Sequence, residues 1–340
     1  MDKGDKSTQG DKSTQGDKST QGDKKYLIAF HSPQLCVRGT SVALYDYAKY
    51  NEELLGNQSI IIIPKNGIND ELGLNHFQNR FKVLFYDGIE KLENLLSDEK
   101  VDIMYCIKYG KNDGIFSKKT KTVIHCVFDM TEPHGDVYAG VSKSLANKFG
   151  SNLFVPHMVS IKKEKGNFRE KLGIPSDAIV FGRYGGEDTF NIIFCIEVIK
   201  EILESRKDIY FLFTNTFQID HPRVLYLPKT TSFEEKSKFI NTCDAHLECG
   251  SLGHSFGLSI AEFSSHNKPI ITYNSTGLWN TEHIRILDKA GIYFSNKEEF
   301  FNILNTFDPK EFRDKDLNMY KEFTPEKVMV IFKEKFIDAL

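Results

Sequence analysis

From Lys25 onward, short apolar runs alternate with stretches in which apolar residues recur at helical spacing. Short apolar runs between turn residues are typical of buried strands, and a period near four is typical of amphipathic helices. In the first half of the chain this pattern predicts a helix that Thr40 or Ser41 caps, and strands at 26–30, 59–64, 82–85, 101–107, 122–127, 137–141 and 153–155. Regular alternation of strand and helix favours an α/β fold with parallel sheets.

A polar, lysine-rich segment around 160–167 is typical of a linker, and a second α/β pattern follows it. We predict strands from Ile179 into the turn Gly185-Gly186 and at 209–213, 224–227, 245–248 and 270–273. Predicted helices cover 192–204, 233–241, 256–265, 282–287, 300–304 and 325–340. With 340 residues the chain is long enough for two domains, which we place at 25–160 and 161–322.

The first 24 residues differ sharply from the rest. Gly-Asp-Lys-Ser-Thr-Gln occurs three times, from Gly4, Gly10 and Gly16, and contains no apolar residue. The segment resembles a degenerate collagen-like repeat of the kind found in proteins of giant DNA viruses, but Ser occupies every second site where a triple helix needs Gly. We therefore expect 1–24 to be a disordered low-complexity tail, with a tether or a modification substrate as alternatives.

Composition excludes several classes of function. A net charge of -3 gives no general electrostatic reason to bind nucleic acid or an anionic membrane. The six cysteines form no C-x2-C pair, so neither a zinc site nor a disulfide framework is indicated, and free thiols suit a reducing compartment. No apolar run approaches the ~18 residues that span a bilayer, so we expect a cytoplasmic protein without an integral membrane segment.

One stretch combines a turn, a helix and a buried strand with candidate chemistry. Gly253 and Ser255 suit a loop and a cap before the helix at 256–265, and an apolar strand follows Pro269. The first amides of such a helix, together with its dipole, form a favourable site for a phosphate. Glu262 adjoins the apolar stripe of this helix, where an unpaired carboxylate is costly.

This stretch resembles the E-x7-E segment of the retaining GT-B glycosyltransferases of family four, usually E-x-F-G-L-x-x-x-E before a strand of the type K-P-V-I. Here it reads His254-x7-Glu262, with Phe256-Gly257-Leu258 and Lys268-Pro269-Ile270-Ile271 intact. The resemblance implies two Rossmann-like domains that face each other across a cleft, with a terminal helix, 323–340, that packs back on the first. It also implies that Glu262 holds the ribose of a nucleotide-sugar and that Ser255, Phe256, Gly257 and Leu258 face its diphosphate and sugar. His254 takes the place of the acid that contacts the donor sugar.

The same resemblance nominates residues elsewhere in the chain. Arg183, followed by Gly185, matches the arginine that neutralises the donor diphosphate, although the lysine that usually follows is absent. His125 stands where the family has a histidine that contacts the donor sugar, with a satisfied interior histidine as the alternative. His246, at the start of the strand 245–248, could reach the cleft. Gly39 and Thr40 stand near the family's Gly-Gly loop, with an ordinary helix cap as the alternative.

By resemblance, then, the protein transfers a sugar from a nucleoside diphosphate sugar to a glycan or protein acceptor with retention of configuration. The scheme requires no metal and no cofactor beyond the donor substrate. A catalytically silent GT-B domain that binds a glycan or protein partner is the main alternative. A sugar epimerase of the same two-domain fold is the third.

Overall fold

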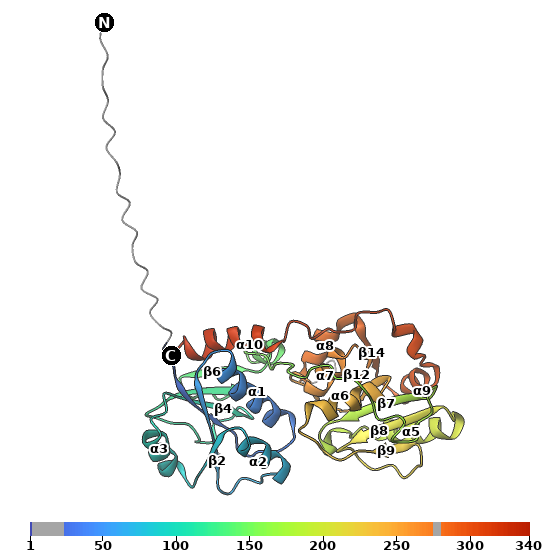
Figure 1. Ribbon diagram of the computed structural model, residues 1–340, viewed down its shortest axis with the longest axis horizontal. Helices are drawn as coiled ribbons and strands as arrows, with labels where there is room; N and C mark the ends of the chain where they lie inside the picture. Colours follow the sequence, from blue (N-terminus) through green and yellow to red (C-terminus); the bar gives the residue numbers. More distant parts are fainter. Residues whose placement is uncertain (2–23, 275–279) are drawn as a thin grey trace.

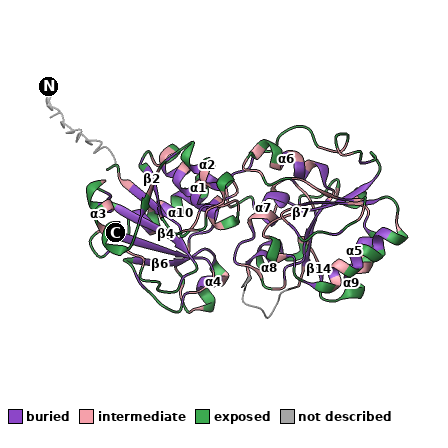
Figure 2. Cartoon of the chain, turned by 90° about the horizontal axis from the view of Figure 1, so that it is seen from below, coloured by how far each residue is buried: buried purple, intermediate pink, exposed green. Residues whose placement is uncertain are grey.

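The computed structural model describes residues 1, 24–274 and 280–340, so the repeat of the amino-terminal tail lies outside the described residues. The described chain forms two α/β domains that lie side by side (Figure 1), each built on one six-stranded parallel sheet. Both predictions, the α/β class and the two Rossmann-like domains, are confirmed. In Figure 2 the inner strands of both sheets are buried and the outer faces of the helices are exposed.

The N-terminal sheet has the strand order β3-β2-β1-β4-β5-β6. Its strands are β1 (Leu27–His31), β2 (Gln58–Pro64), β3 (Lys82–Tyr86), β4 (Ile103–Lys108), β5 (Lys121–Cys126) and β6 (Val137–Gly140). The helices of this domain are α1 (Gly39–Glu53), α2 (Glu71–Gln78), α3 (Ile89–Asp98) and α4 (Lys143–Lys148). The strand expected at 153–155 is reduced to a single bridge between Gly140 and Phe154.

The C-terminal sheet has the order β14-β12-β10-β7-β8-β9. Its strands are β7 (Ile179–Tyr184), β8 (Ile209–Thr214), β9 (Val224–Tyr226), β10 (Ala245–Glu248), β12 (Ile270–Tyr273) and β14 (Gly291–Phe294), and β11 (Gly253–His254) pairs separately with β13 (Asn280–Thr281). The α-helices are α5 (Ile193–Ser205), α6 (Phe233–Thr242), α7 (Leu258–Ser265), α8 (Glu282–Leu287) and α9 (Lys297–Thr306), with short 3-10 turns at Glu187–Thr189, Asp288–Ala290 and Pro309–Phe312.

The two sheets share one topology, because the order of β7, β8, β9, β10, β12 and β14 repeats that of β1 to β6. In each sheet the order reverses next to the first strand, between β1 and β4 and between β7 and β10. Ligands of open parallel sheets bind outside the carboxyl ends of the strands at this reversal. The topology thus predicts a ligand-binding edge at the carboxyl ends of the strands in each domain.

The chain ends in α10 (Pro325–Phe332) and a π-helical turn (Lys333–Ile337). Phe332 and Phe336 are buried in the core of the N-terminal domain, where Phe332 stacks on Tyr47 with ring centroids 5.2 Å apart. The last segment of the chain therefore packs on the first domain after the second has been completed, which ties the two together (Figure 1).

Two predicted helix starts were wrong. Helix α1 begins at Gly39 with Arg38 as its N-cap residue, and Ser41 instead accepts a hydrogen bond from the amide of Cys36. Helix α7 begins at Leu258, two residues later than predicted, because Gly257 adopts a left-handed conformation at the N-cap position (φ 83°). Ser255 is therefore no cap, and His254 lies in a strand outside the helix.

Candidate functional site

A cavity of about 850 Å³ lies between the two domains. Its N-terminal wall comes from the loop after β1, the start of α1 and the ends of β4 and β5. Its C-terminal wall comes from the ends of β7, β8 and β10, the loop 250–257 and the first two turns of α7. The cavity thus occupies the ligand-binding position that the sheet topology predicts.

The amino end of α7 faces this cavity through Leu258 and Ser259. Gly257 precedes them with no side chain to cap the helix, and no side chain in the described part of the chain accepts from the first amides. A side chain at 257 would be strained at φ 83° and would bring its Cβ within 3.2 Å of Ile260 Cδ1. Free amides and the positive end of the helix dipole make this turn suitable for a phosphate. The predicted residues Ser255, Phe256, Gly257 and Leu258 all line the cavity.

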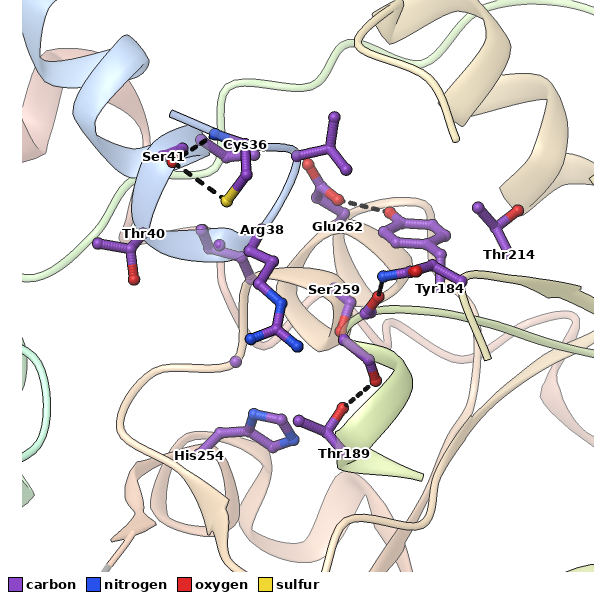
Figure 3. Close-up of a pocket in the computed structure, with 18 of the residues that line it drawn as sticks. Cys36, Arg38, Thr40, Ser41, Tyr184, Thr189, Thr214, His254, Ser259 and Glu262 are labelled. Atoms are coloured by element: carbon purple, nitrogen blue, oxygen red, sulfur yellow. Dashed lines mark hydrogen bonds between the residues drawn. The ribbon is translucent and has the colours of Figure 1, made fainter. Parts of the chain in front are cut away.

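Glu262 also lines the cavity, although only 4% of the residue is exposed. Tyr184 Oη donates a hydrogen bond to its Oε2 (2.5 Å), which Figure 3 shows as a dashed line. Lys236 Nζ lies 3.5 Å from the other oxygen, Oε1. Burial and the neighbouring Glu262 raise the pKa of Tyr184 well above its usual value, so the phenol keeps its proton and remains a donor. The carboxylate that the sequence predicted to be costly if unpaired is therefore paired twice.

On the opposite wall, the two candidates Gly39 and Thr40 line the cavity at the start of α1. The two walls meet there, because a Cβ at Gly39 would lie 3.6 Å from Leu258 Cδ1. Arg38 reaches from this turn toward Thr189 and His254 (Figure 3) and forms an ion pair with Asp188 of the other domain. The sequence did not single out Arg38, whose role depends on the facing domain.

Arg183 is not where its motif places it. Its guanidinium is fully buried and does not line the cavity. Nη1 donates to Thr216 Oγ1 (2.8 Å), and Nη2 donates to Thr189 Oγ1 (2.5 Å) and to the carbonyl of Gly186 (3.3 Å). Gly185, which does line the cavity, allows this approach, since its Cβ would lie 3.1 Å from Nη2. We therefore assign Arg183 the role of holding the turn at 185–189, in place of the predicted phosphate contact.

His125 and His246 are likewise interior residues. Tyr105 Oη lies 2.6 Å from Nδ1 of His125, and its Nε2 lies 2.8 Å from the carbonyl oxygen of Val155, so both ring nitrogens are used inside the N-terminal core. His246 is fully buried and lies against Phe263, with ring centroids 4.4 Å apart. Neither histidine lines the cavity, so the alternative that the sequence left open for His125, a satisfied interior histidine, describes it.

His254 does line the cavity, and it brings with it a residue that the sequence analysis missed. Its Nε2 lies 3.3 Å from Oε1 of Glu248, a carboxylate at the carboxyl end of β10 that also lines the cavity. Burial alone would raise the pKa of Glu248, but His254 and Arg183 more than offset burial and hold that pKa well below its usual value. A charged residue at the carboxyl end of the buried strand β10 was the available signal.

Within the described parts of the chain, no group of three or more His, Cys, Asp or Glu side chains is placed to hold a metal ion. The expectation that no metal is required stays a prediction. In the same residues, no helix is long and apolar enough to cross a lipid bilayer.

No protein-family profile matches the sequence. No curated protein sequence matches it closely enough to show a relationship. Solved structures do match the fold. A glycosyltransferase from Rickettsia africae superposes with a TM-score of 0.65 at 14% identity, over 92% of this chain and 99% of the other.

HepE (Alr3699) of Anabaena, solved with UDP-glucose, superposes with a TM-score of 0.63 at 12% identity, over 92% of this chain and 96% of the other. A candidate UDP-N-acetylglucosamine 2-epimerase from Listeria monocytogenes gives a TM-score of 0.58 at 13% identity, over 93% and 98%. Together with the topology and the interdomain cavity, these similarities show that the chain has the GT-B fold.

Proposed function

We propose that this protein transfers a sugar from a nucleoside diphosphate sugar to a glycan or protein acceptor, with retention of anomeric configuration. One observation carries the proposal: on one wall of the interdomain cavity, the uncapped amino end of α7 and the carboxylate of Glu262 lie on the same helix. Such a pair matches the two polar ends of a nucleoside diphosphate, its phosphates and its ribose hydroxyls. The GT-B neighbour solved with UDP-glucose supports uridine nucleotides as the first to test.

In this proposal the amides of Leu258 and Ser259 bind the diphosphate, and Arg38 adds positive charge from the facing domain. Glu262 accepts hydrogen bonds from the ribose hydroxyls, and Tyr184 and Lys236 fix its orientation. His254, at the position of the family's first acid, contacts the donor sugar. Each role falls on a residue that lines the cavity.

The reaction breaks the bond between the anomeric carbon and the diphosphate oxygen, and the electron pair leaves with the diphosphate. The acceptor hydroxyl attacks the anomeric carbon on the same face and passes its proton to the departing phosphate oxygen, which gives retention. Helix amides and a nearby cation stabilise the charge that develops on the leaving diphosphate without reorganisation. These groups supply that stabilisation without a divalent metal.

Two observations favour a second candidate, a silent GT-B domain that binds a glycan or protein partner. His254 replaces the usual acid, and Arg183 faces its own turn instead of the cavity. The epimerase alternative is supported by the fold it shares with the Listeria protein.

One experiment separates the three. The protein is incubated with a panel of nucleoside diphosphate sugars, with and without acceptor glycans, and the products are identified by NMR. A transferase releases nucleoside diphosphate and forms a glycoside with the donor's anomeric configuration. An epimerase changes the sugar and leaves the nucleotide attached, and a silent domain leaves every donor intact.

A further inference from the structure

The buried Glu248 and the partly exposed His254 form a close pair at the edge of the cavity. Oε1 of Glu248 lies 3.3 Å from Nε2 of His254, and both atoms are shielded from solvent. Among the described residues, neither atom has a well-aligned hydrogen-bond partner. Glu248 is 2% exposed, whereas the side chain of His254 is 22% exposed and lines the cavity.

The pair restricts how the imidazole can carry its proton. An ionised carboxylate only accepts hydrogen bonds, so the ring nitrogen that faces it is the one that bears hydrogen. When the imidazole carries a single proton, that proton is on Nε2, and Nδ1 is left as an acceptor. In a histidine, the group that pairs with one ring nitrogen thus sets what the other nitrogen offers.

The surroundings keep Glu248 available for this role. A Cβ at Gly250 would lie 2.9 Å from Oε1, so the glycine leaves room for the carboxylate. Oε2 faces Nε2 of His246 at 3.7 Å, and burial lowers the pKa of His246, so this second imidazole is neutral. His283 meets the ring of His254 edge to face, with centroids 5.3 Å apart, and helps to fix the ring plane.

We propose that Glu248 is a positioning residue that holds His254 with its proton on Nε2, so that Nδ1 accepts a hydrogen bond from a hydroxyl of the donor sugar. The sugar contact rests on the proposed function, whereas the tautomer does not. This arrangement explains how a histidine takes the place of the family's first acid. An imidazole in this tautomer presents an acceptor to the cavity, as a carboxylate would. The carboxylate of Glu248 lies on the other side of the ring, at Nε2.

The tautomer is tested on the ligand-free protein by 15N NMR of the His254 ring, followed upward in pH until the ring carries a single proton, with the signals assigned through their loss in H254Q. We expect Nε2 protonated and Nδ1 unprotonated in the wild type. In E248M, which removes the acceptor, we expect a mixture of tautomers, whereas E248Q retains an acceptor oxygen and retains the Nε2 proton. An unprotonated Nε2 in the wild type would overturn the proposal whether or not any variant folds.

The sugar contact is tested by calorimetric titration with UDP and with the tightest-binding UDP-sugar of a panel. The dissociation constant of UDP divided by that of the UDP-sugar measures how much the sugar contributes to binding. We expect E248M and H254Q each to reduce this ratio roughly 3- to 10-fold, the size of one hydrogen bond, and the double variant to lose no more than H254Q alone. E235Q is the matched control: Glu235 also lines the cavity, but its carboxylate accepts a hydrogen bond from Thr230, so this change should leave the ratio unchanged.

Additive losses in the double variant, or an unchanged ratio in both single variants, would overturn the sugar contact. Failure of the wild type to bind UDP at all would instead overturn the proposed function. The NMR result would still report the Glu248 and His254 pair in that case.

Discussion

The hydroxyl of Tyr184 donates a 2.5 Å hydrogen bond to the carboxylate of Glu262, and so joins the carboxyl end of β7 to helix α7. With Lys236 near the other oxygen, the carboxylate is fixed in orientation before any ligand binds. A carboxylate offers about four lone-pair sites, so two partners leave acceptors for the hydroxyls of a ribose. The cavity therefore contains a preorganised acceptor.

We expect E262Q to weaken UDP binding roughly 10-fold or more, because hydrogen bonds to a charged acceptor contribute about 1.5–3 kcal/mol. Y184F should weaken it less, since this change removes an orienting group and leaves the acceptor in place. Calorimetric titration with UDP measures both. Equal UDP affinity in E262Q and wild type would mean that the ribose lies elsewhere.

Arg183 should matter for folding before it matters for binding. R183A leaves Thr189, Thr216 and the Gly186 carbonyl without their shared donor and Glu248 without a nearby buried cation. Loss of one member of such a buried network costs about 3 kcal/mol or more in the free energy of unfolding. Denaturant unfolding tests this, with R80A as control, since the pair of Arg80 with Glu52 is partly exposed. If R183A unfolds like the wild type, the structural role is wrong, and the role predicted from the sequence, a phosphate ligand, is favoured again.

The ion pair of Arg38 and Asp188 crosses between the domains in partly exposed positions. Exposed pairs add little stability, so R38A should unfold like wild type. If Arg38 binds the diphosphate, R38A should weaken UDP binding roughly fivefold, and D188N should strengthen it, because Asp188 competes for the guanidinium. The control R80A should change neither the UDP affinity nor the unfolding curve. Tighter binding by R38A would contradict the assignment.

Stability should fall as the pH is lowered from about 6.5. Burial, the largest cause, lowers the pKa of His125 to about 3, and His31 and His283 behave alike. The unfolded imidazole takes up a proton near pH 6.5 but the folded one does not until about pH 3, so the unfolded state binds more protons in this window. Within this window, each such histidine lowers the free energy of unfolding by about 1.4 kcal/mol for every pH unit of acidification.

Asp46 opposes this trend, because burial raises its pKa to about 7 and protonation on acidification relieves that cost. H125Q isolates one histidine: its free energy of unfolding should fall less steeply between pH 6 and pH 4 than that of wild type, by about one proton's worth of slope. Denaturant titrations across this range measure the difference. Parallel pH profiles for the two proteins would show that His125 takes up its proton equally in both states.

The sheets could be predicted because buried parallel strands appear as short apolar runs, and β10 and β12 have the bounds that the sequence indicated. The start of α7 could not, since the left-handed backbone of Gly257 places the cap where a serine two residues earlier was the more usual choice. Thr40 and Ser41 likewise are usual capping residues, but the N-cap position is taken by Arg38, whose side chain makes no capping hydrogen bond.

The candidate site was predicted where contacts are local in sequence. Glu262 and the turn at 255–258 line the cavity because they belong to one helix and the loop before it. Arg183 was misplaced, since a motif shows that an arginine follows a strand but does not show which way the side chain turns. Arg38 and Glu248 were missed because their partners, Asp188 and His254, come from another domain or another strand.

The most direct test of the central claim is whether the wild-type protein binds UDP and consumes a UDP-sugar. UDP at about one hundred times its dissociation constant should add about 2.7 kcal/mol to the free energy of unfolding. At least one UDP-sugar should then yield UDP and a product whose anomeric signal in NMR retains the donor's configuration, with both effects reduced in E262Q. If UDP gives no stabilisation and no donor in a broad panel is turned over, the account is contradicted.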